Sequence, residues 1–157
     1  MRKDVWRKES VALLALAALI LFGFGCGKKT ENSANETGTY KKALNAADEA
    51  AAVRSLQTIF RAETQYMTIH SGNYGTFDEL VADGSLDERF KGSAPTLEGY
   101  TFTLRATPDS GQGSAYTVNA DPKDGAAGRH LYMDSASNVV RANATRPATA
   151  SDPPLQP

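Results

Sequence analysis

The sequence is poor in the residues that build common catalytic and metal-binding sites. Its 157 residues include one cysteine, so no disulfide bond can form within the chain. Two histidines and one cysteine are also too few for a typical zinc site. Basic and acidic residues are nearly balanced, at 17 and 18, and they form no long basic run, which argues against a nucleic-acid partner.

Catalytic patterns are scarce as well. The two histidines, His70 and His130, fall in segments that we interpret as structural, and neither belongs to a recognisable nucleophile–base arrangement. Asp121 and Asp124 suggest a calcium loop, but the loop lacks the dense oxygen spacing of such sites, and a plain turn is the better interpretation. We therefore expect no enzymatic activity, no cofactor, no metal and no small-molecule substrate.

One long apolar run is present, at residues 11–24, and it contains no charged side chain. Residues 1–10 before it are basic on balance, which is the order of an export signal. The run is shorter than the roughly 20 residues that a membrane-spanning helix usually needs. Small residues and the single cysteine, Cys26, follow it directly.

Residues 23–27, Gly-Phe-Gly-Cys-Gly, resemble the lipobox of bacterial lipoproteins. The resemblance implies that residues 1–25 are a signal peptide and that Cys26 becomes an N-terminal residue carrying acyl chains such as palmitate. It also places the domain in the cell envelope, facing the periplasm or the cell surface, and Gly27 favours the outer membrane. Gly23 departs from the aliphatic residue usual at its position, and the alternative is an uncut single-span anchor.

The next segments predict a spacer and a long helix. Residues 26–39 contain no large apolar side chain after the cysteine and should form a flexible tether. Residues 43–70 contain no glycine or proline and predict one long helix, ended by the breaker cluster at residues 71–75. Its apolar residues recur at helical spacing and form one stripe. They are Val53, Leu56, Ile59, Phe60, Tyr66 and Met67.

Glu63 falls inside this apolar stripe. One interpretation is a carboxylate for recognition or for a metal. The other is a structural carboxylate that accepts hydrogen bonds from loop N–H groups or lies at the edge of the stripe. Because a buried carboxylate must be paired, we favour the structural role.

The remaining chain predicts short helices and a sheet. Residues 76–79 and 85–88 are both capping boxes, which predict helical turns at residues 77–82 and 86–90. Alternating segments then predict antiparallel strands with one face for the long helix. These segments are residues 100–107, 114–120, 129–134 and 138–143. Residues 144–157 hold four prolines and should form a loose tail.

The predicted fold class is therefore α+β, with one long N-terminal helix packed on a sheet of three or four antiparallel strands. This order resembles type IV pilins and the pseudopilins of type II secretion, over a globular domain at residues 40–143. Short sequence segments are also similar to those of short pilin-like proteins. The matching segments are SLQTI at residues 55–59, AE at 62–63, GYTFTL at 99–104, YTVNADP at 116–122 and YMD at 132–134.

One departure from the pilin pattern affects the expected function. Prepilins have a Gly-Phe cleavage site and then a long hydrophobic helix that bears a glutamate at its fifth position. Here Gly23-Phe24 leads into Cys26 and a polar stretch instead. We therefore expect a non-enzymatic, membrane-anchored module that binds protein partners, such as pilus or secretion components. The alternatives are a true pilin or pseudopilin subunit and, more remotely, a periplasmic enzyme.

Overall fold

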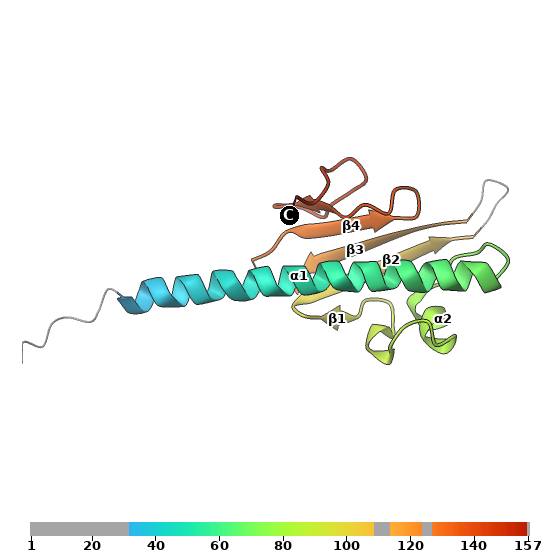
Figure 1. The fold of residues 1–157 in the computed structure, drawn as a ribbon, viewed down its shortest axis with the longest axis horizontal. Helices are drawn as coiled ribbons and strands as arrows, with labels where there is room; N and C mark the ends of the chain where they lie inside the picture. Colours follow the sequence, from blue (N-terminus) through green and yellow to red (C-terminus); the bar gives the residue numbers. More distant parts are fainter. Residues whose placement is uncertain (1–31, 109–113, 124–126, 157) are drawn as a thin grey trace, which may run out of the picture.

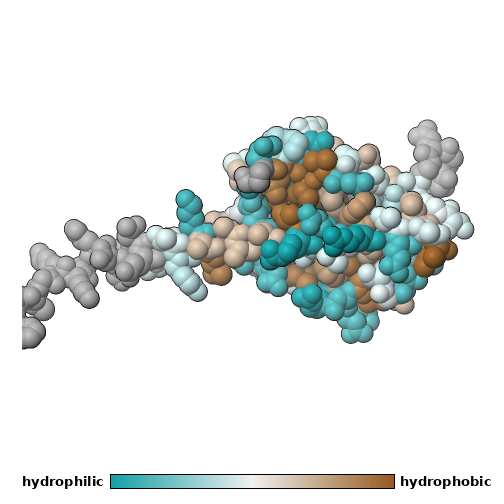
Figure 2. All heavy atoms as spheres, in the orientation of Figure 1, coloured by the Kyte–Doolittle hydropathy of each residue, from teal (hydrophilic) through white to brown (hydrophobic). Residues whose placement is uncertain are grey.

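Helix α1 (Asn32–Ile69) crosses one face of an antiparallel sheet built from the second half of the chain (Figure 1). The computed structural model describes residues 32–108, 114–123 and 127–156. The predicted apolar stripe of α1 faces the sheet, and its outward surface carries hydrophilic side chains (Figure 2). These outward residues are Arg54, Gln57, Arg61 and Gln65.

The helix begins earlier than predicted, at Asn32 instead of residue 43. The prediction of a flexible tether is therefore wrong for residues 32–39, which continue the helix away from the sheet (Figure 1). The physical reason is that adding residues to a packed helix costs far less than starting a new one, so polar residues without proline can extend it. Residues 1–31, with the predicted signal peptide, lie outside the described residues.

The end of α1 is at the predicted position. Gly72 has a positive φ of 85° and donates its N–H to the carbonyl of Met67 at 3.0 Å, which closes the helix in the left-handed manner that glycine permits. The chain then turns into helix α2 (Phe77–Ala82), which matches its prediction. Thr76 and Glu79 form the predicted capping box at its start.

The prediction of a second capping box, at residues 85–88, is wrong. The helical turn after α2 is η1 (Glu88–Phe90), which is shorter than the predicted residues 86–90. Its cap is Asp87, whose carboxylate accepts the N–H of Arg89 at 2.9 Å, and Ser85 takes no part in the cap. A carboxylate next to the first turn caps it better than a serine two residues further away.

The sheet has five strands in the order β1-β2-β3-β4-β5, not three or four. The bounds are β1 Thr96–Leu97, β2 Tyr100–Thr107, β3 Ala115–Pro122, β4 His130–Asp134 and β5 Arg141–Asn143. Strand β1 has only two residues, too few for an alternating pattern. Glu98 and Gly99 join it to β2, and both have positive φ, as a tight two-residue hairpin turn requires.

The core lies between α1 and the sheet. Leu56 and Ile59 of α1 have no exposed surface, and neither do Phe102, Val118 and Leu131 from three successive strands. Alternation along each strand brings these side chains to the face that α1 covers. The α+β architecture follows from this single helix–sheet seam.

The prediction of a loose C-terminal tail is wrong. Leu155 donates its N–H to Val140 at 2.8 Å, and Ala142 donates its own to Pro153 at 3.2 Å, so residues 153–155 run along the outer edge of β5. Ala148 is buried, and its carbonyl accepts a hydrogen bond from the side chain of Asn119 in β3.

A buried aspartate organises this tail. The carboxylate of Asp152 accepts hydrogen bonds from the side chains of Asn143 and Arg146 and from both the N–H and the hydroxyl of Thr149. These bonds hold the pKa of Asp152 well below its usual range. The segment is held in place by polar contacts between irregularly spaced residues. Such contacts leave no periodic pattern of apolar residues from which the structure could be predicted.

We expect the substitution Leu56→Ala to lower the free energy of unfolding by about 2–5 kcal/mol, because it leaves a cavity in the helix–sheet seam. Gln57→Ala, on the exposed side of the same helix turn, should change it by less than about 0.5 kcal/mol. Urea denaturation measures both values. Equal effects of the two substitutions would contradict this packing.

Candidate functional site

Among the buried residues of α1 that the structure describes, Glu63 is the only charged one, and its side chain has no exposed surface. Its Oε2 accepts the backbone N–H of Gly75, in the loop between α1 and α2, at 2.9 Å. A Cβ at residue 75 would lie 3.1 Å from the ring of Tyr66, so glycine lets this loop approach the helix closely. The hydrogen bond from a loop N–H is the contact expected for a structural carboxylate.

Burial raises the pKa of Glu63 to about 7, against the opposing effect of the Gly75 hydrogen bond, and the nearby charge of Glu79 raises it further. Its Oε1 is buried without a hydrogen-bond partner among the described residues, and so is the hydroxyl of Tyr116 in β3. Burial raises the pKa of Tyr116, and the charge of Glu63 adds to that rise. The surroundings of Glu63 therefore favour its neutral, protonated form.

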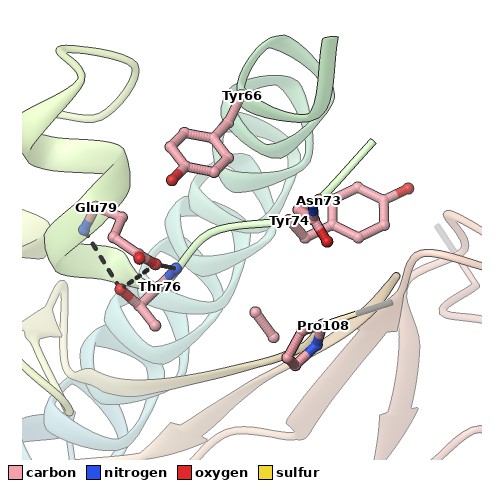
Figure 3. A pocket seen from close by; sticks show the side chains of 7 residues that line it. Tyr66, Asn73, Tyr74, Thr76, Glu79 and Pro108 are labelled. Carbon is pink, nitrogen blue, oxygen red and sulfur yellow. Dashed lines mark hydrogen bonds between the residues drawn. The ribbon is translucent and has the colours of Figure 1, made fainter. Parts of the chain in front are cut away.

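A hollow of about 350 Å³ opens beside this loop (Figure 3). It is lined by Tyr66, Asn73, Tyr74, Thr76, Glu79, Ala106 and Pro108. The carboxylate of Glu79 already accepts both the N–H and the hydroxyl of Thr76 in the capping box. Glu63 does not line the hollow, and a fully buried carboxylate cannot contact a ligand as a general acid or base must.

An ion pair connects α1 to the start of β4. Glu49 accepts hydrogen bonds from the guanidinium of Arg129 at 2.6 and 3.1 Å and from its backbone N–H at 3.1 Å. Burial alone would raise the pKa of Glu49, but these bonds lower it overall. The pair fixes the position at which α1 leaves the sheet, which is a structural task.

Both histidines lie beside carboxylates. His130 Nδ1 is 2.6 Å from Asp121 Oδ1, whereas the ring of His70 stacks on Tyr66 at 3.7 Å and lies near Asp83. Within the described ranges, no three His, Cys, Asp or Glu side chains are grouped to hold a metal ion. Residues 124–126 are not described, so the plain turn at residues 121–124 stays a prediction.

Cys26, the predicted acylation site, lies outside the described residues. None of the described helices is both long and apolar enough to span a membrane. One surface feature of α1 is not among the predictions: Tyr40 and Leu44 are large, apolar and exposed before the helix reaches the sheet. Their spacing of four residues is the signal for this feature, but the predicted tether ends at residue 39 and the predicted helix begins at residue 43, so Tyr40 falls between the two.

Comparison with known proteins finds no match to a family model, to a curated protein or to a solved structure.

The pKa of Glu63 predicts a specific pH dependence of stability. The unfolded chain should release this proton near pH 4.5, whereas the folded chain keeps it to about pH 7. The folded state binds more protons between these values, so the free energy of unfolding should fall as the pH rises from 4.5 to 7. At about 1.4 kcal/mol per pKa unit, the loss is about 3 kcal/mol.

The substitution Glu63→Gln should remove this loss, because a glutamine carries no proton to release. Denaturation between pH 5 and 8 measures the difference from the unchanged protein. Glu88→Gln, at an exposed position in η1, is the matched control and should keep the original profile. A Glu63→Gln profile that also follows the original one would show that Glu63 does not titrate in this range.

Proposed function

We propose that this chain is a pilin-like lipoprotein of the bacterial cell envelope, a non-enzymatic module that binds other protein. Its anchor is acylated Cys26, and its most fitting partners are components of a pilus or a secretion system. The observation that carries the proposal is the division of α1 into two parts. One part packs on the sheet, and the other projects away from it (Figure 1).

The order of elements supports the pilin-like part of the proposal. A long first helix, short capped turns and an antiparallel meander follow one another, with each strand beside its neighbour in sequence. The helix covers one face of this meander, as in the pilin head domains that the sequence resembles. The fifth strand and the ordered tail extend the layout without changing it.

The sequence before α1 supports the anchor. The uncharged apolar run of residues 11–24 ends two residues before Cys26, and only residues 27–31 separate that cysteine from the start of α1. Each methylene of an acyl chain that enters the bilayer contributes about 0.8 kcal/mol, and two chains give a stable anchor. Gly27 favours the outer membrane, with the domain facing the periplasm or the cell surface.

Three carboxylates at the borders of the core support a structural role over catalysis. Glu63 lies beneath a loop, Glu79 caps α2, and Glu49 pairs with Arg129. Each carboxylate thus has a task within the fold, which leaves protein binding as the better proposal for this domain.

A pilin or pseudopilin subunit is the second candidate, and one observation favours it. Helix α1 starts at Asn32, so the polar gap after the apolar run is shorter than the predicted tether. A filament subunit needs a helix that is continuous with its apolar segment. Against it, Gly25, Gly27 and two lysines interrupt the sequence, and the segment lacks the glutamate usual in prepilins.

The intact mass of the protein from its native membrane separates the two candidates. We expect a mass that begins at Cys26 and includes acyl chains, and we expect Cys26→Ala to lose the acyl mass and the membrane association. Thr30→Ala, which leaves the lipobox intact, should behave like the unchanged chain. A mass that begins at Phe24 or Met1, with Cys26→Ala still in the membrane, would instead support the subunit or an uncut anchor.

A further inference from the structure

Two large apolar side chains on the projecting part of α1 are open to solvent. Tyr40 is 70% exposed and Leu44 is 48% exposed. They are four residues apart, so they lie on the same side of the helix, about one turn from each other. Exposing both costs free energy that a contact would recover, since apolar area removed from water contributes about 25 cal/mol per Å².

Charge near these two side chains indicates what the contact is. Lys41 is exposed, and it is only about 60° around the helix from Leu44 at roughly 3.6 residues per turn. Between Glu36 and Asp48, residues 37–47 contain two lysines and no acidic residue. Tyrosine prefers the headgroup level of a bilayer, and a lysine beside it can place its charge among anionic phosphates.

The chain before α1 keeps this surface close to a bilayer. Six Cα steps join Cys26 to Asn32, and at roughly 3.3–3.6 Å each they reach at most about 22 Å. Tyr40 lies about 12 Å further along the helix, at ~1.5 Å per residue. An anchor at Cys26 therefore holds the first turns of α1 within reach of the membrane surface at all times.

We propose that Tyr40, Lys41 and Leu44 form a membrane-contact patch that rests on the anionic surface of the bilayer holding the anchor. This inference rests on the proposed lipid anchor and goes beyond it, because it sets the orientation of the domain. Asp48, one turn after Leu44 on the same side, lies close to Gly99 in the β1–β2 turn. The β1 edge of the sheet is therefore the edge nearer the bilayer, and the C-terminal segment on β5 faces away.

Tryptophan fluorescence tests the patch in the full chain. Cleavage before Cys26 removes the single native tryptophan, Trp6, and Trp6→Phe in every variant keeps any uncut chain from contributing fluorescence. One new tryptophan is introduced by Tyr40→Trp, Leu44→Trp or Ala46→Trp. Ala46 is exposed on the opposite side of α1 and is the matched control. The acylated chains are placed in phosphatidylcholine–phosphatidylglycerol vesicles whose acyl chains carry bromine, a short-range quencher.

We expect bromine to quench the tryptophans at positions 40 and 44 at least twofold more than the one at position 46. Lys41→Glu should reduce the quenching at position 44, because it reverses the charge beside the patch. Lys42→Glu, about 160° around the helix from Leu44, should reduce it less. Omitting phosphatidylglycerol should weaken the quenching in the same way as Lys41→Glu.

Co-flotation with the vesicles, measured in the same samples, separates the two proposals. A chain that floats but shows equal, weak quenching at all three positions overturns the patch and leaves the anchor intact. A chain that floats and shows shielded tryptophans at positions 40 and 44 without bromine quenching also overturns it, in favour of a contact with a second copy. A chain that does not float contradicts the anchor and, with it, the patch.

Discussion

Burial of one stripe of α1 against the sheet is the interaction on which the rest of the structure depends. Leu56 and Ile59 meet Phe102, Val118 and Leu131 in a seam without exposed surface. The helix has 38 residues, and only its second part has this support. The projecting first part is helical because it extends the supported part, since propagation costs far less than nucleation. The direction in which the projecting part of α1 leaves the sheet thus follows from core packing.

Polar groups at the borders of this seam connect α1 to two loops. Glu49 pairs with Arg129 where α1 leaves the sheet, and Glu63 accepts the Gly75 N–H where the chain turns into α2. Both bonds join α1 to loops that have few apolar side chains of their own. The charged form of Glu63 is less stable in the fold than the protonated form, because one of its oxygens is buried without a hydrogen-bond partner among the described residues. The same geometry that orders the loop therefore makes stability sensitive to pH.

Features with a regular local signal were predictable from the sequence. The α1 stripe, the alternation of β2 and the Thr76–Glu79 capping box depend on spacing within a few residues. Features held by contacts between distant residues were missed. Strand β1 exists because a tight turn pairs two residues with β2, and the tail is ordered by the hydrogen bonds of Asp152. Glu63 was located correctly because a charge breaks an apolar stripe visibly, whereas its partner Gly75 came from a loop.

Helix α1 is one rigid element from its projecting first part to the part that packs on the sheet. Electron-spin distance measurement between labels at Lys42→Cys and Gln57→Cys tests it directly, in the acylated chain whose native cysteine is occupied. Both positions are exposed, one before the sheet and one over it. A continuous helix predicts one narrow distance distribution centred at about 22 Å, from ~1.5 Å per residue. A broad distribution, or one centred well away from that value, would show that the projecting segment is not a rigid extension of the domain.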